Sequence, residues 1–106
     1  MTAGNARSVA AVRQRENTNA ARRRLTGGIA SGQITLDDLF GLVRDGNWAA
    51  TGLRVAHVLA ALIGRHDPNR VQRLLDEIAA WEDTTLSQLS AGQRIRLVRI
   101  AARYGR

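Results

Sequence analysis

The sequence predicts an all-α protein, and three observations support this fold class. Apolar residues recur at spacings of three and four, no stretch alternates apolar with polar residues, and helix-capping patterns separate the apolar runs. The length of 106 residues suits one compact body, which we divide into a basic N-terminal helix, residues 1–33, and a helical domain, residues 34–106. Because only four residues are aromatic, the core is expected to be mostly aliphatic.

The first helix is expected from about Ala6 to Ser31. Its first half is polar, and an apolar face begins near Leu25 and Ile29, with Gly32 as a C-terminal cap. The pair Gly27-Gly28 lowers helix propensity by about 1 kcal/mol per glycine, so a bend or break is expected there.

Two shorter helices are expected next. One follows Thr35, where Thr-x-x-Asp resembles a capping box, and is expected to bury Leu36, Leu39, Phe40 and Val43. After a turn at residues 45–47, another is expected from about Thr51 to Leu62, ending at Gly64. Its apolar stripe, at positions i, i+3, i+4 and i+7, consists of Val55, Val58, Leu59 and Leu62.

The pair Asp67-Pro68 is the clearest helix start, because an acidic N-cap precedes proline at the first helical position. This helix is expected to reach about Ala80, with an apolar stripe of Val71, Leu74, Leu75 and Ile78.

Two capping boxes close the chain. The patterns Thr85-x-x-Gln88 and Ser90-x-x-Gln93 predict a helical turn over 86–89 and a last helix from Ala91 to about Tyr104. In that helix we expect an apolar face of Ile95, Val98 and Ala102. A second face forms an Arg ridge, which we define as Arg96, Arg99, Arg103 and Arg106.

Positive charge is concentrated at the two ends of the chain. All 16 basic residues are Arg, and the formal net charge is +7. Residues 1–33 carry six Arg and one acid, residues 34–93 carry five Arg and eight acids, and residues 94–106 carry five Arg and no acid. This layout favours a polyanionic partner, although solvated Arg-rich faces are the simpler interpretation.

Several function classes are excluded by composition. Without Lys or Cys the chain has neither the phosphate-loop lysine nor thiolates for zinc or catalysis. His57 and His66 lack ligand companions, so we expect no metal, no cofactor, no small-molecule substrate and no enzymatic activity. Trp48 and Trp81 are interpreted as core or hinge residues. The longest apolar run, 58–63, is too short to span a bilayer, and we expect a cytoplasmic protein without membrane contact.

From about Ala20 to Ile100 the sequence resembles the actinobacterial integration host factor family. The resemblance rests on the order of elements and on the segments Ala21–Leu25, Leu53–Val55, Leu59–Leu62, Val71-Gln72, Asp76–Ile78 and Leu86–Arg94. It differs in two places: Gly64 is separated from the cap at Asp67, and residues 82–85 replace a basic cluster.

This resemblance implies a helix-two-turns-helix preceded by a long basic helix. It also implies duplex DNA binding with little sequence preference, DNA bending or compaction, and location on the nucleoid. Assistance to site-specific recombination is implied as well, which makes a recombinase or another host protein an expected partner.

Candidate nucleic-acid contacts fall into three groups, at residues 22–24, at the turn around Asp67 and at residues 94–99. Arg22, Arg23 and Arg24 span most of one helical turn, so they cannot all face the core. The turn around Asp67 could hold a phosphate on backbone N–H groups and Arg side chains. The full set of candidates is Arg22, Arg23, Arg24, Gly64, Arg65, Asn69, Arg70, Arg73, Arg94, Arg96 and Arg99.

Two alternatives to DNA binding remain open. One is binding to structured RNA, because the helix-two-turns-helix that the resemblance implies also occurs on the ribosome. The other alternative is a protein-interaction module, such as a phage-encoded or regulatory factor that acts on a host complex through its acidic middle and its tryptophans.

Overall fold

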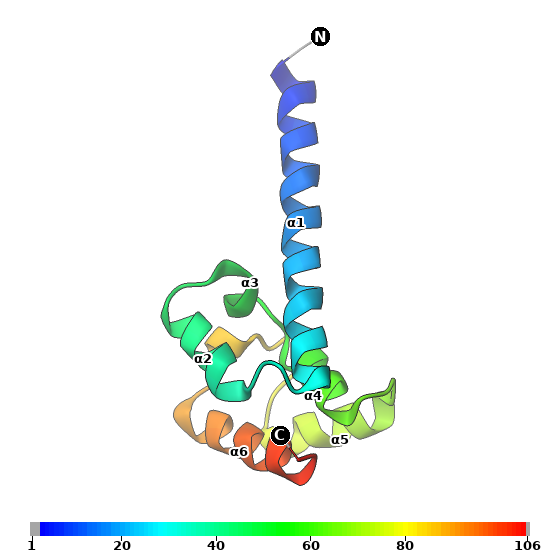
Figure 1. The fold of residues 1–106 in the computed structure, drawn as a ribbon, viewed down its shortest axis with the longest axis vertical. Helices are drawn as coiled ribbons and strands as arrows, with labels where there is room; N and C mark the ends of the chain where they lie inside the picture. Colours follow the sequence, from blue (N-terminus) through cyan, green and yellow to red (C-terminus); the bar gives the residue numbers. More distant parts are fainter. Residues whose placement is uncertain (1–2, 106) are drawn as a thin grey trace.

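The computed structural model describes the backbone of residues 3–105 and the side chains of residues 17–105 (Figure 1). The elements are α1 Ala3–Ser31, α2 Leu36–Arg44, α3 Trp48–Thr51, α4 Val55–Ile63, α5 Pro68–Ile78, the 3₁₀ turn η1 Leu86–Gln88 and α6 Ala91–Arg103. Over these residues the predicted all-α class is confirmed, since the only extended pairing is an isolated bridge between Arg54 and Thr85. The charges expected on the first half of α1 lie on side chains outside the described ones.

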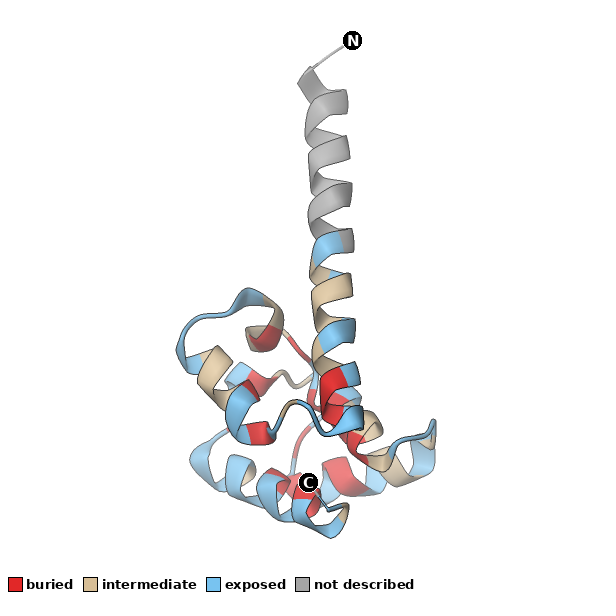
Figure 2. Cartoon of the chain, in the orientation of Figure 1, coloured by how far each residue is buried: buried red, intermediate tan, exposed pale blue. Residues whose placement is uncertain are grey.

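Helix α1 projects from a body formed by the other helices, and its C-terminal turns pack on α3 and α4 (Figure 1). Ile29 is buried there and Leu25 is half-buried against the same core. Buried residues gather where these turns meet the other helices (Figure 2). The last turns of α1 therefore belong to the same hydrophobic core as the other helices.

Helix α4 supplies the centre of the core. Its predicted stripe is confirmed, because Val55, Val58, Leu59 and Leu62 are all buried. On α5 the stripe buries Leu74, Leu75 and Ile78, while Val71 is half-buried at its edge. Full burial of one such side chain stabilises the fold by roughly 1.5–3 kcal/mol, which explains why helices of 9 and 11 residues persist.

The predicted caps at Thr35, Asp67 and Ser90 are confirmed, and they mark where α2, α5 and α6 begin. Thr35 accepts from the backbone of Asp38 at 3.1 Å, while the Asp38 carboxylate accepts from the Thr35 backbone at 3.0 Å. The same reciprocal pattern joins Ser90 to Gln93, and the Gln88 side chain accepts from the Thr85 backbone at 2.9 Å. The chain thus marks these helix starts through local hydrogen bonds.

The helix does not break at Gly27-Gly28, because α1 is helical through both residues. A Cβ at position 28 would collide with the side chain of Ile34, whose N–H donates to the Gly28 carbonyl at 3.0 Å. Gly32 ends the helix at φ 80°, as predicted. Gly28 therefore allows the loop that follows α1 to pass close to the helix.

The helix expected over 51–62 begins only at Val55, as α4, and a short helix that was not expected, α3, precedes it, with residues 52–54 between them. Asn47 caps α3 by accepting from the Ala50 backbone at 3.0 Å. The backbone then becomes extended: the Val55 N–H donates to the Thr84 carbonyl, and the Leu86 N–H donates to the Leu53 carbonyl, each at 2.9 Å. These bonds to a distant segment outweigh helix continuation.

The last two helices differ from expectation at two points. Helix α5 ends at Ile78 rather than at 80, because Ala79 adopts a left-handed conformation with φ 64°. On α6 the predicted apolar face was wrong: its buried residues are Leu97, Ile100 and Ala101. The predicted residues Ile95, Val98 and Ala102 lie on the exposed side. Two apolar stripes run along this helix, and the one that reaches Tyr104 packs inward.

Candidate nucleic-acid interface

A groove of about 970 Å³ runs between α1 and α4. Arg22 and Arg23 line it from α1, His57 lines it from α4, and Arg54 lies where the extended segment enters α4. None of its lining residues is acidic. The groove therefore presents positive charge from two sides to a ligand that lies along it.

Small residues form most of the rest of the groove. They occur on α1 at Thr26, Gly27 and Ala30, and on α4 at Ala60 and Ala61 with Gly64 at its end. Side chains of this size let a ligand backbone approach the helices closely. The surface suits an elongated polyanion whose charges reach the flanking guanidinium groups.

The three neighbouring Arg residues on α1 have different environments. Arg22 is half-buried, and its Nε donates to the Ala49 carbonyl at 3.3 Å. Its guanidinium also occupies the space that a Cβ at Gly52 would need. Arg23 and Arg24 are exposed, and of these two only Arg23 lines the groove. Arg22 thus ties α1 to α3, whereas Arg23 is available to a ligand.

Sequence reasoning missed Arg54 and treated His57 as structural. A usable signal was present, because both helices repeat one spacing of a charged or imidazole residue followed by small ones. On α1 the positions are 23, 26, 27 and 30, and on α4 they are 57, 60, 61 and 64. Two facing stripes at i, i+3, i+4 and i+7 predict a shallow groove between helices.

The turn between α4 and α5 adjoins this groove, because Gly64 lines the groove and begins the turn at φ 80°. Asp67 caps α5 by accepting from the Arg70 backbone at 3.1 Å. Its carboxylate also lies 3.9 Å from Arg65 and 3.7 Å from Arg70. The helix N-terminus therefore already holds an anion, while the remaining candidates Asn69 and Arg73 are exposed.

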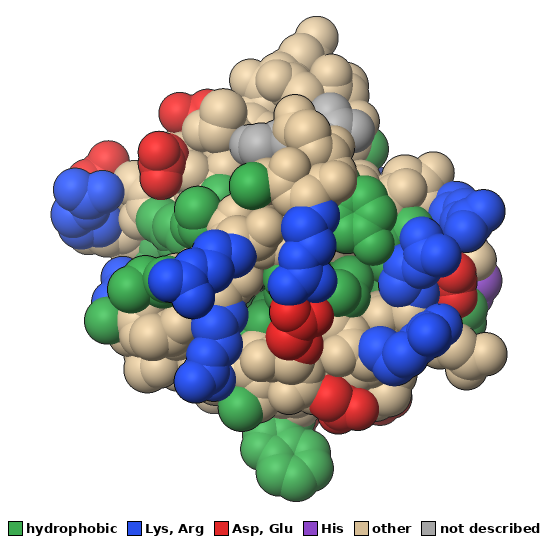
Figure 3. Space-filling model, turned by 90° about the horizontal axis from the view of Figure 1, so that it is seen from below, with side chains coloured by type: hydrophobic (Ala, Val, Ile, Leu, Met, Phe, Trp, Pro, Cys, Tyr) green, Lys and Arg blue, Asp and Glu red, His purple; other side chains and the backbone are tan. Residues whose placement is uncertain are grey.

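The Arg residues of α6 lie on a different face. Figure 3 views the side on which α5 and α6 lie and shows Arg side chains spread across it with hydrophobic groups between them. Arg94 and Arg99 are exposed, and Arg96 reaches the Ile78 carbonyl at 3.5 Å. The structure does not bring these residues to the groove.

Like Arg96, Arg103 of the Arg ridge is engaged within the chain. Arg103 forms a two-pronged ion pair with Glu77 on α5, with one N–O distance of 3.1 Å. These hydrogen bonds hold the pKa of the Glu77 carboxyl below its ordinary value and raise the pKa of Arg103. Arg103 is therefore less available to a phosphate than Arg99, and the pair weakens as pH falls through the lowered pKa.

The expectation that the tryptophans are core residues is wrong. Trp48 on α3 is 60% exposed and Trp81 after α5 is 79% exposed, so neither is a core residue. His57 and His66 are also exposed.

No described group of three or more acidic or imidazole side chains is arranged to hold a metal ion. Among the described helices, none combines the length and apolar character that crossing a bilayer requires. Comparisons with protein-family models, curated proteins and solved structures found no match to this chain.

Proposed function

We propose that this chain is a non-enzymatic protein that binds duplex DNA with little sequence preference. The observation that carries the proposal is the acid-free groove between α1 and α4, with Arg23, Arg54 and His57 around a surface of small residues. Guanidinium groups bind phosphate through charge-assisted hydrogen bonds, and such contacts orient a protein on DNA without reading bases.

The resemblance noted in the sequence supports the same assignment. We propose that α4, the turn at residues 64–67 and α5 form the helix-two-turns-helix of the integration host factor type. In this arrangement Arg65, Asn69, Arg70 and Arg73 would extend the groove contact along the phosphate backbone.

DNA bending or compaction is part of this proposal. Arg94 and Arg99 of α6 are exposed, and neither lines the groove. Two separate basic faces allow one protein to hold two segments of a duplex, and binding the second segment offsets the cost of bending the DNA. A recombinase or other host protein would then act on the shaped DNA.

A mobility-shift comparison tests the proposal. Duplex DNA, duplex RNA and single-stranded DNA are each titrated at 50 and 200 mM salt. If about six Arg neutralise phosphates, the slope of log affinity against log salt is about −5, and duplex DNA affinity falls roughly thousandfold between these conditions. A slope near zero contradicts DNA binding, and tighter binding to duplex RNA would favour the structured-RNA alternative.

Replacing Asp67 by Ser tests whether the turn touches the DNA. Ser keeps the cap acceptor but removes the anion beside Arg65 and Arg70, so stability should change by less than about 0.5 kcal/mol. DNA affinity should rise roughly fivefold, because about 1 kcal/mol of repulsion is removed. Thermal melting and mobility shift measure the two effects. Unchanged affinity would place the turn away from the DNA.

A further inference from the structure

A hydrogen-bonded turn over residues 81–84, which we name the Trp81 turn, holds an aromatic side chain in solvent. The Trp81 N–H donates to the Thr84 hydroxyl at 2.9 Å, and the Thr84 N–H donates to the Trp81 carbonyl at 3.2 Å. The indole is 79% exposed, more than any other large hydrophobic side chain described. A large aromatic group on a fixed backbone is typical of the residues that anchor protein interfaces.

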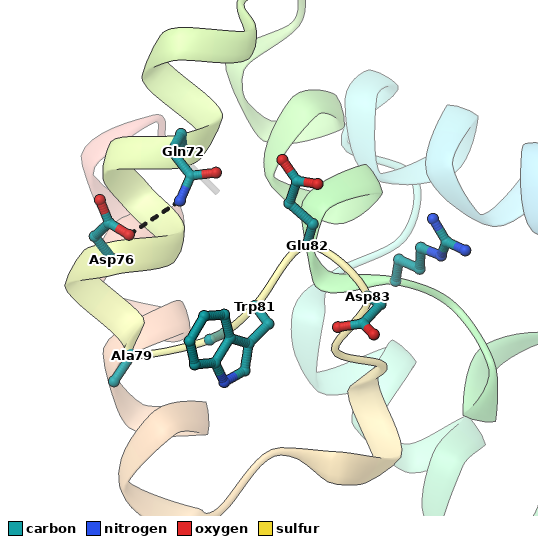
Figure 4. Close-up of a pocket in the computed structure, with 8 residues that line it drawn as sticks. Gln72, Asp76, Ala79, Trp81, Glu82 and Asp83 are labelled. Carbon is teal, nitrogen blue, oxygen red and sulfur yellow. Dashed lines mark hydrogen bonds between the residues drawn. The ribbon is translucent and has the colours of Figure 1, made fainter.

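Carboxylates accompany this indole. Glu82 and Asp83 belong to the Trp81 turn, and Asp76 faces the same hollow of about 1040 Å³ from α5 (Figure 4). Asp76 is hydrogen-bonded to Gln72 at 3.0 Å, and Arg54 is the only basic residue that lines the hollow. A complementary surface must therefore combine an apolar socket with a basic rim.

The same chain carries such a socket. A cleft of about 290 Å³, which we name the α2–α6 cleft, lies among α2, η1 and the start of α6. Arg44 and Arg94 form its exposed basic rim, and no ion pair joins either of them to a described carboxylate. Its volume is at the lower end of ligand pockets and suits one aromatic side chain. The apolar lining consists of the half-buried Phe40 and Val43 above the buried Leu86 and Leu89.

We propose that the Trp81 turn of one copy docks into the α2–α6 cleft of a second copy, with Glu82 and Asp83 opposite Arg44 and Arg94. The two surfaces lie on different sides of α6 within one chain. The Trp81 turn follows Ala79, whose carbonyl accepts from Gln93, on the α5 side, whereas the cleft is on the α2 side. A second copy carries both complementary surfaces, and the charges favour docking of a turn into a cleft over pairing of two clefts, which would oppose Arg with Arg.

This contact joins two different patches, so each added copy leaves a free turn at one end and a free cleft at the other. Such head-to-tail contacts form open chains unless the rotation closes a ring. The net charge of +7 opposes the approach of two copies, and salt screens this repulsion beyond a Debye length of about 8 Å at physiological ionic strength.

Cysteine cross-linking without nucleic acid tests this inference independently of the proposed function. The chain has no native Cys, so the variants Glu82→Cys and Ser87→Cys each carry one thiol, one in the Trp81 turn and one in the cleft. Under mild oxidation, a mixture of the two should form heterodimers at least about tenfold faster than either variant forms homodimers. Equal rates, or no cross-link in the mixture, would overturn the proposal.

The indole provides a second test in the same assay. Adding Trp81→Ala to the Glu82→Cys chain should slow cross-linking at least about tenfold, because loss of an interface anchor usually has an effect of this size. Trp48→Ala, at an exposed indole on α3, is the matched control and should leave the rate unchanged. Circular dichroism confirms that each variant is folded. Insensitivity to Trp81→Ala would show that contact occurs elsewhere.

Discussion

Replacing Arg23 and Arg54 together by Glu is expected to weaken duplex DNA binding at least roughly hundredfold. Both side chains are exposed, and they line the groove from different segments. Hydrogen bonds to charged groups contribute about 1.5–3 kcal/mol each, and the introduced carboxylates would repel phosphates. The magnitude of the salt slope should fall by about 2, because two phosphate contacts are removed. Mobility shift at several salt concentrations measures both quantities.

The matched control places the same charge change outside the groove. Arg24→Glu with Arg44→Glu alters two exposed Arg residues that do not line it. The loss of DNA affinity that this pair causes should be at least about tenfold smaller than the loss caused by the groove pair, since it acts only through longer-range repulsion. Equal losses would mean that overall charge, rather than the groove, determines affinity. Arg22 is left unchanged because its bond to Ala49 is structural.

Leu97→Ala is expected to cause the largest loss of stability among single substitutions on α6. Leu97 is fully buried, and truncating a core Leu costs about 2–5 kcal/mol. For a chain of this size the melting temperature should fall by about 10 °C or more. Thermal unfolding followed by circular dichroism measures the change.

The neighbouring residue provides the control for Leu97→Ala. Val98 is 43% exposed, so Val98→Ala should change the free energy of unfolding by less than about 1 kcal/mol, with some gain from the better helix propensity of Ala. If Val98→Ala proved the more damaging substitution, the rotation of α6 about its axis would be wrong.

Local signals predicted most of the helices. The capping boxes at Thr35, Thr85 and Ser90 and the Asp67-Pro68 start depend on residues three positions apart, so they can be read from the sequence alone. The stripe on α4 was equally clear, because its other faces carry small or polar residues.

Nonlocal contacts account for what the sequence did not reveal. On α6, Ile95 and Leu97 begin rival stripes, and only packing against the other helices decides between them. The break before Val55 depends on backbone bonds to a segment about thirty residues away. The groove was missed for a related reason, since its two stripes form one surface only because α1 packs against α4.

The absence of buried polar or charged side chains among the described residues affects how the fold responds to salt. Every described charged side chain keeps contact with water, and exposed ion pairs contribute little to stability. The fold therefore depends mainly on apolar burial, and its melting temperature should change little between 50 and 200 mM salt. A loss of DNA affinity over that range would then report on the interface rather than on unfolding.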